Sequence, residues 1–140
     1  MLLIGLMMWS FFKVFPALTL NWTYSAVAAV VMVLLGLVIS LGGVVTFKGA
    51  NTTMDPKHPD QASTLISSGI YRYSRNPMYL GVLFMLVGWG FYLANLLSIL
   101  CVLIFVGYIT RFQIIPEERL LQEKFGPEFL SYKRRVRRWL

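Results

Sequence analysis

The sequence predicts an all-α membrane protein with four transmembrane helices. Hydrophobic residues make up 57% of its 140 residues and charged residues 14%, which is too apolar a balance for an ordinary water-soluble domain. Residues 14–47 and 76–110 contain no charged side chain, and each block exceeds the roughly 20 apolar residues that cross a bilayer. One cysteine, Cys101, excludes a disulfide scaffold. We therefore expect one membrane domain over residues 1–140.

The first two spans are expected over residues 2–20 and 25–47. Between them, residues 21–24 (NWTY) provide turn-forming side chains and aromatic rings that suit the membrane interface. A cleaved signal peptide is the alternative for the first segment, but no basic residue precedes Lys13, where such a peptide has its charged start. We expect this segment to remain as a span.

The second apolar block is expected to form a helical hairpin. As one straight helix, residues 76–110 would be about 52 Å long at roughly 1.5 Å per residue, far more than the hydrocarbon core requires. Asn95 and Ser98 are the turn residues in its middle. The third span is thus expected over residues 77–94 and the fourth over 97–115.

Small residues on two of these spans predict close helix packing. On the second span, three small residues fall near one face, where another helix could approach closely. On the third span, the glycines do not follow a predicted strand, so they do not fit a nucleotide-binding loop and are expected to serve helix packing as well. These residues are Gly36, Ser40 and Gly43 on the second span and Gly81, Gly88 and Gly90 on the third.

Basic residues predict the orientation in the membrane. Twelve of the 13 Lys and Arg residues occur in the loop 48–75, at Arg111 or in the tail 116–140. Basic residues accumulate on the cytosolic side of membrane spans, so we expect loop, tail and both termini to be cytosolic. No acidic residue lies inside a span, which disfavours proton-coupled transport. The tail also contains acids and an apolar stripe, which argues against nucleic-acid binding.

The tail is expected to form a helix that restarts after the fourth span. Pro116 suits the first helical position, Glu117 and Glu118 suit the first turn, and Gly126 with Pro127 would end the helix. Beyond this point, apolar residues recur every three or four positions among basic ones, which predicts an interfacial amphipathic helix. The stripe consists of Phe129, Tyr132, Val136 and Trp139.

A candidate site follows from the hairpin. Because the third and fourth spans go out and return, residues 75–79 and the pair Glu117 and Glu118 are expected at the same membrane face. The 28-residue loop 48–75 is long enough to be functional. Simpler roles are open for each part: Asn76-Pro77 as a helix start, Arg75 reaching lipid headgroups, and the two glutamates as acids that favour a helix N-terminus. His58 has no second metal-ligating neighbour, so no metal is expected.

Two segments resemble a known family. Residues 63–81 (STLISSGIYRYSRNPMYLG) and 116–140 (PEERLLQEKFGPEFLSYKRRVRRWL) are similar to the isoprenylcysteine carboxyl methyltransferases and their phospholipid methyltransferase relatives. The resemblance implies an integral membrane enzyme. Such an enzyme transfers a methyl group from S-adenosylmethionine, leaving S-adenosylhomocysteine, to a lipophilic acceptor that arrives from the bilayer.

The resemblance also implies site residues. Glu117 would meet the cofactor's ammonium group, and the amides at the start of the third span its carboxylate. Arg75 and Gly81 would be supporting residues. The implied cofactor contacts are Ser63, Thr64, Leu65, Ile66, Tyr71, Asn76, Pro77, Met78, Tyr79 and Glu117.

Two departures from the family pattern leave the acceptor open. The family's usual His is Asn76 here, and an Arg associated with the acceptor carboxylate is Gln113. Arg111 lies about 200° around an ideal helix from that position. A prenylcysteine carboxylate, a phospholipid amine and a small thiol all stay possible acceptors. For an amine, Glu118 or water would take the proton. The alternative class is a non-enzymatic membrane assembly or transport subunit, and the oligomeric state is not predicted.

Overall fold

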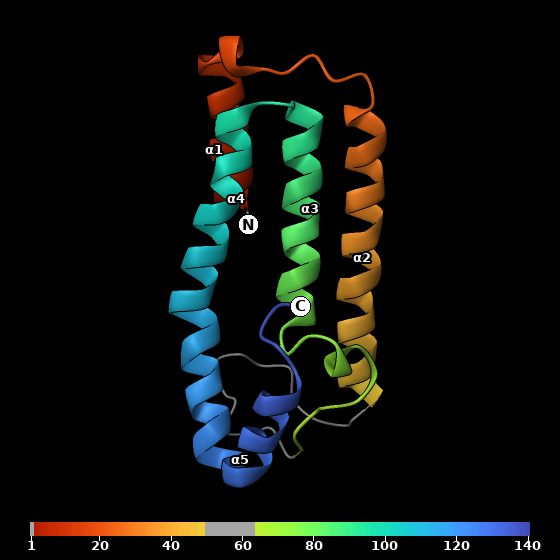
Figure 1. The fold of residues 1–140 in the computed structure, drawn as a ribbon, viewed down its shortest axis with the longest axis vertical. Helices are drawn as coiled ribbons and strands as arrows, with labels where there is room; N and C mark the ends of the chain where they lie inside the picture. The colour runs from red at the N-terminus through yellow and green to blue at the C-terminus, as the bar shows by residue number, and fades with distance from the viewer. Residues whose placement is uncertain (1, 50–63) are drawn as a thin grey trace. The chain divides into compact units, whose positions relative to one another are not determined.

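The secondary structure is helical, as expected. The computed structural model describes residues 2–49 and 64–140 (Figure 1), so the predicted site residue Ser63 lies outside the described part. Apart from one isolated bridge between Thr19 and Asn95, the regular elements of the described part are helices and helical turns. They are α1 (Leu2–Val14), η1 (Pro16–Leu18), α2 (Ser25–Gly49), η3 (Gly69–Arg72), α3 (Pro77–Leu93), α4 (Leu96–Ile109), the π-helical turn η4 (Thr110–Ile114) and α5 (Ile115–Arg135).

Two of these helices are long and apolar enough to cross a membrane. They are Ser25–Gly49 and the continuous stretch Leu96–Arg135, while α1 and α3 are apolar but have 13 and 17 residues. The first predicted span, 2–20, is α-helical only as far as Val14. The chain then enters the short 3-10 turn η1, which has Pro16 at its start, because proline cannot donate the next helical hydrogen bond.

The described contacts divide the chain into two compact units. The first unit comprises Met1–Val38 with Gly81–Tyr108, and the second comprises Ile39–Leu80 with Ile109–Leu140. Each unit is built from segments that are distant in the sequence.

In the first unit, Asn95 closes the hairpin between α3 and α4 (Figure 1). Its Oδ1 accepts hydrogen bonds from the backbone N–H groups of Leu97 (3.1 Å) and Ser98 (3.3 Å), so it caps α4. Its Nδ2 donates to the Phe15 carbonyl oxygen at 2.9 Å. Asn95 is fully buried, and these bonds satisfy its polar atoms. The predicted turn at Asn95 is confirmed.

Glycines allow α2 and α3 to pack closely in the first unit. A Cβ atom at Gly36 would lie 2.5 Å from the Gly81 carbonyl oxygen, and one at Gly88 would lie 2.8 Å from the Ala29 carbonyl oxygen. Both distances are shorter than van der Waals contact, so no larger residue fits without moving backbone. The prediction that these glycines serve helix packing is confirmed.

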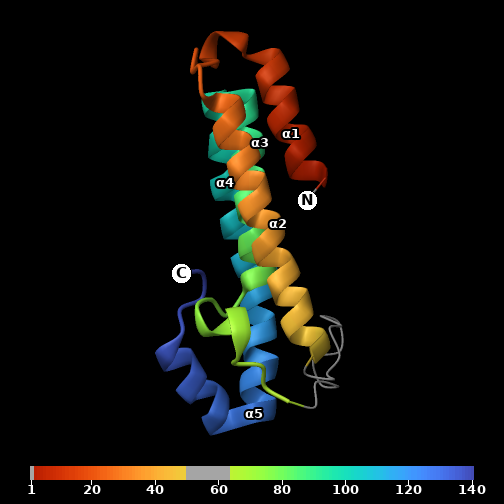
Figure 2. The same ribbon diagram turned by 90° about the vertical axis from the view of Figure 1, so that its right-hand side faces the viewer.

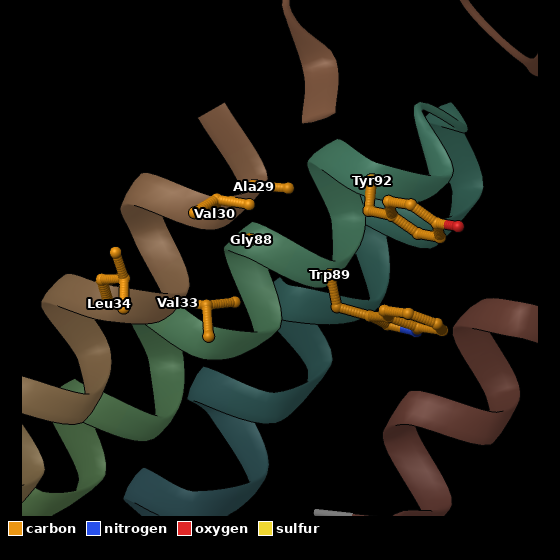
Figure 3. Close-up of a pocket in the computed structure, with 7 residues that line it drawn as sticks. All are labelled: Ala29, Val30, Val33, Leu34, Gly88, Trp89 and Tyr92. Carbon is orange, nitrogen blue, oxygen red and sulfur yellow. The ribbon is translucent and has the colours of Figure 1, made fainter. Parts of the chain in front are cut away.

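A shallow apolar groove also lies between α2 and α3 in the first unit. It has a volume of about 280 Å³, and Figure 3 shows Trp89 and Tyr92 projecting from α3 beside it. Their rings stack with centroids 5.5 Å apart, and Trp89 donates to the Gly5 carbonyl oxygen of α1 at 3.2 Å. None of the predicted site residues lines this groove.

In the second unit, α5 bends and its last turns pack against the chain itself. Gly126 has φ 47° and ψ −119°, which interrupts the helix before Pro127, and Figure 2 shows the change of direction there. Phe129, Tyr132 and Val136 form a buried cluster. The expectation that this apolar stripe belongs to an interfacial helix is therefore wrong for these three residues, because the second unit buries them, whereas Trp139 is partly exposed.

We expect Gly36→Ala to destabilise the α2–α3 pair. The new methyl group would meet a backbone carbonyl oxygen at 2.5 Å, which no side-chain rotation relieves, and such overpacking costs about 1–3 kcal/mol. Thermal unfolding of detergent-purified protein should therefore show a lower midpoint. Gly107→Ala is the matched control, since nothing lies within 4 Å of a Cβ atom there; an equal effect of both substitutions would contradict close packing at Gly36.

Candidate functional site

The starts of α3 and α5 meet at Glu117. The Tyr79 hydroxyl donates to Glu117 Oε1 at 2.8 Å, and Gln113 Nε2 donates to the same oxygen at 2.6 Å. Tyr79 and Glu117 are 38 residues apart in the sequence. The expectation that these two segments come together is confirmed, and the hydrogen bonds link them directly.

A π-helical turn sets the position of Glu117. The Ile115 N–H donates to the Thr110 carbonyl oxygen, five residues earlier. In a regular α-helix, Pro116 has no N–H to donate to the carbonyl oxygen of the residue four positions before it. Its ring would also clash with that carbonyl group. The wider turn accommodates the proline, and π-helical turns are frequent at functional sites. As expected, Pro116, Glu117 and Glu118 lie in the first turn of α5, but no break precedes them, because the helix continues from α4 through η4.

Glu117 is a partly buried acid that pairs with no cation of the described residues. Burial raises its pKa, and the hydrogen bonds from Gln113 and Tyr79 oppose that rise. Among residues 2–49 and 64–140, Glu117 forms no ion pair, and its hydrogen bonds converge on Oε1. Its second carboxylate oxygen accepts no hydrogen bond from these described residues.

Tyr71 lies near this carboxylate. Burial raises the pKa of its hydroxyl, and the charges of Tyr132 and then Glu117 raise it further, so the hydroxyl stays protonated at neutral pH. The Tyr71 ring contacts that of Phe47 edge to face with centroids 5.5 Å apart. Its carbonyl oxygen accepts a hydrogen bond from the Tyr132 hydroxyl at 2.8 Å. Tyr71 thus contacts both α2 and the tail, and it lies near Glu117.

Glu118, the next residue, has the opposite environment. Arg75 donates to its Oε1 at 2.6 Å and Arg138 to its Oε2 at 2.7 Å. Burial alone would raise the pKa of Glu118, but the hydrogen bonds and charges of Arg138 and Arg75 outweigh it and hold the pKa below its usual value. Glu118 is therefore an ionised structural partner, and this arrangement does not favour its use as a proton acceptor.

Arg75 is buried and points into the protein. Its guanidinium also donates to the carbonyl oxygens of Lys133 (3.1 Å) and Val136 (2.7 Å), and its side chain is 8% exposed. The alternative in which Arg75 extends to lipid headgroups does not fit these contacts. Instead, Arg75 ties the segment before α3 to the end of α5.

The backbone around Arg75 holds the same tail segment. The Arg75 N–H donates to the Arg137 carbonyl oxygen at 3.0 Å. Asn76 Nδ2 donates to the Arg138 carbonyl oxygen at 3.0 Å, and the Ser74 hydroxyl to the same oxygen at 3.4 Å. The side-chain amide of Asn76 is thus used to hold the tail next to the start of α3.

The described part of the loop is packed. Leu65 contacts the cluster of Phe129, Tyr132 and Val136, and Ile66 is buried. Gly69 has φ +56°, and a Cβ atom there would lie 2.7 Å from the Thr46 hydroxyl oxygen, so glycine suits this close approach to α2. The expectation that the loop docks onto the protein is confirmed for this stretch.

The other predicted residues have different surroundings. Pro77 is buried, and both it and Met78 lie against Gly43 of α2. Thr64 and Arg111 are exposed. Sequence reasoning missed Arg138, because it lies in a run of basic residues whose members look alike in the sequence.

Comparison with known proteins identifies the family. The sequence model of the phospholipid methyltransferase family matches residues 24–128, which include α2, α3, α4 and most of α5. The chain belongs to this family. Tyr79 and Glu117 both lie within the matched residues.

Several relatives are similar over most of the chain. A protein of Oryza sativa subsp. indica named probable protein-S-isoprenylcysteine O-methyltransferase is 34% identical over 122 residues, 87% of this chain and 63% of its own length. The Homo sapiens protein-S-isoprenylcysteine O-methyltransferase is 27% identical over 114 residues, 81% of this chain and 40% of its own. A Haemophilus influenzae protein named uncharacterized is 49% identical over 63 residues, 45% of this chain and its own full length. The chain thus spans about two fifths to three fifths of the two methyltransferase relatives.

Proposed function

We propose that the protein transfers a methyl group from S-adenosylmethionine to a lipophilic acceptor at the cytosolic membrane surface. The observation that carries the proposal is the environment of Glu117. It is a partly buried carboxylate, two hydrogen bonds fix one of its oxygens, and no cation pairs with it among the described residues. A buried carboxylate without a counter-charge is costly. A cationic ligand removes that cost.

The residues present fit the proposed cofactor. S-adenosylmethionine has an ammonium group that matches Glu117, and bound there it supplies a sulfonium methyl group that is ready for transfer. The Nε atom of Arg75 is buried without a hydrogen-bond partner in the described part. One acceptor and one donor close to α3 thus remain available to a ligand that carries both an ammonium and a carboxylate.

The residues of this chain would act mainly by positioning. Tyr79 and Gln113 hold Glu117 in one orientation, and the apolar side chains of Leu65 and Ile66 would exclude water from the loop side of the bound cofactor. In-line transfer depends chiefly on the alignment of donor and acceptor. The proposed cofactor contacts are Ser63, Thr64, Leu65, Ile66, Tyr71, Asn76, Pro77, Met78, Tyr79 and Glu117, with Gly81 and Arg75 as supporting residues.

We expect S-adenosylhomocysteine to bind the purified protein and Glu117→Gln to weaken that binding about 10- to 100-fold. The substitution keeps the shape but removes the charge, and a hydrogen bond to a charged group contributes about 1.5–3 kcal/mol. Isothermal titration in detergent measures the dissociation constant. Glu123→Gln is the matched control, since Glu123 is exposed on the same helix. Absence of binding to the wild type at millimolar ligand would exclude the proposed function.

The pH dependence of binding provides a further control on Glu117. Its pKa is raised in the free protein, and an ammonium ligand favours the ionised form. Binding therefore releases a proton, so affinity should rise with pH through the acidic range and level off above the raised pKa. In Glu117→Gln, this part of the pH dependence should disappear. Titrations across a pH series measure both proteins.

We further propose that the chain crosses the membrane four times with both termini cytosolic. α3 has 17 residues, the lower limit of the roughly 17–25 that span a bilayer, and α1 with 13 residues would need the residues that follow it. In a Cys101→Ala background, cysteines placed at positions 60 and 124 should both react with an impermeant reagent only from the cytosolic side. Labelling from opposite sides would rule out this topology.

For the acceptor, we propose a prenylcysteine carboxylate or a similar lipophilic group. This proposal is supported by the names of the rice and human relatives, both of which are protein-S-isoprenylcysteine O-methyltransferases by name. Gln113 is engaged by Glu117, which leaves exposed Arg111 as the cationic candidate for an acceptor carboxylate.

Membranes incubated with methyl-labelled S-adenosylmethionine and this protein should yield label in the apolar extract. If the acceptor is a carboxylate, alkali should release that label as methanol, because it hydrolyses a methyl ester. Alkali-stable label would indicate an amine or a thiol instead. No incorporation above that of Glu117→Gln would favour a non-enzymatic membrane subunit.

A further inference from the structure

Arg138 occupies a central position in the second unit. Its guanidinium donates to Glu118 from Nε (3.1 Å to Oε1) and from Nη2 (2.7 Å to Oε2). Its carbonyl oxygen accepts hydrogen bonds from Asn76 Nδ2 and the Ser74 hydroxyl. One residue near the end of the chain thus contacts both segments that form the candidate site, and Figure 2 shows the chain end returning beside the segment that leads into α3.

Two of the residues that Arg138 contacts are sequence neighbours of proposed cofactor contacts or are such contacts themselves. Glu118 directly follows Glu117 on α5, so the ion pair restricts the rotation of the turn that carries Glu117. Asn76 directly precedes Pro77, so the hydrogen bond to the Arg138 carbonyl oxygen restricts the entry into α3 and hence Tyr79. Arg75 joins the two sides through Glu118.

We propose that Arg138 is a positioning residue, which holds Glu117 and Tyr79 in the arrangement that binds the cofactor. This inference rests on the proposed function. Arg138 itself touches Glu118, Ser74 and Asn76, and it acts on the ligand through them. The C-terminal segment is in this view part of the site and not only a basic tail.

The neighbouring arginine does not share this environment. Arg137 and Arg138 have the same chemistry, but the side chain of Arg137 is exposed and forms no hydrogen bond or ion pair within the described ranges 2–49 and 64–140. Arg137 contacts Arg75 through its backbone carbonyl oxygen. Replacing the Arg137 side chain with alanine leaves this oxygen in place. Arg137→Ala is therefore a matched control.

Removal of the Arg138 side chain should not unfold the second unit. Arg75 still pairs with Glu118 at 2.6 Å, so the buried carboxylate keeps one cation, and the cluster of Phe129, Tyr132 and Val136 is untouched. A loss of ligand affinity without a comparable loss of stability would then indicate positioning.

The test measures binding of S-adenosylhomocysteine to detergent-purified full-length protein. We expect Arg138→Ala to weaken binding about tenfold, within the roughly 5- to 150-fold range typical of coupling between sites. Arg138→Lys, which keeps one charge but loses the two-pronged geometry, should recover part of the affinity, and Arg137→Ala should bind like the wild type. Equal affinity of Arg138→Ala and the wild type would overturn the inference and leave the proposed function intact.

A measurement on the wild type decides the case in which Arg138→Ala does not fold. Coupling is reciprocal, so the ligand should in turn stabilise the contacts of the tail. Amide exchange at Arg75 and Val136, whose N–H groups donate to the Arg137 and Tyr132 carbonyl oxygens, should slow when S-adenosylhomocysteine binds. Binding without any slowing there would overturn the inference. If the wild type does not bind at all, the proposed function and this inference fail together.

Discussion

The arrangement of the second unit depends on the buried ion pair between Arg75 and Glu118. These side chains are 8% and 9% exposed, and loss of one partner from such a pair costs about 3–5 kcal/mol because it leaves the other charge uncompensated. The pair joins the segment before α3 to the first turn of α5, 43 residues apart. Separating these segments would remove the carboxylate partner of Arg75, although Arg138 would still pair with Glu118, so the ion pair favours the arrangement in which Tyr79 contacts Glu117.

The two adjacent glutamates have different roles because their surroundings differ. Arginines hold the pKa of Glu118 below its usual value, whereas burial raises the pKa of Glu117, which has no ion-pair partner in the described part of the chain. A pair of titratable groups whose environments move their pKa values apart is a frequent feature of functional sites. In this protein, one carboxylate is paired with two arginines, and the other is the carboxylate that we propose as the partner of a positively charged ligand. Neither role can be assigned from the dipeptide alone.

Local sequence features predicted much of the helical architecture. The charge-free block with Asn95 in its middle predicted the α3–α4 hairpin, because a bilayer limits helix length and Asn caps a helix start. Gly36 and Gly43 predicted close helix contacts. The predictions failed where one local sequence pattern is compatible with two different structures. Pro116 suited a helix start, but a π-helical turn accommodates it within a continuous helix, and the stripe from Phe129 to Val136 suited a membrane interface, but it packs against Leu65.

By itself, the sequence determined that the chain forms apolar helices, that α3 and α4 turn back on each other, and that Tyr79 and Glu117 therefore meet. These features follow from hydrophobicity, chain length and turn residues, which act over a few residues at a time. Only the tertiary structure decided which arginines pair with Glu118, and that Glu117 pairs with no cation among residues 2–49 and 64–140. The contacts of Arg75 and Asn76 with the tail join residues about 60 positions apart, and one arginine in a basic run differs from its neighbours only through the partners that folding brings to it.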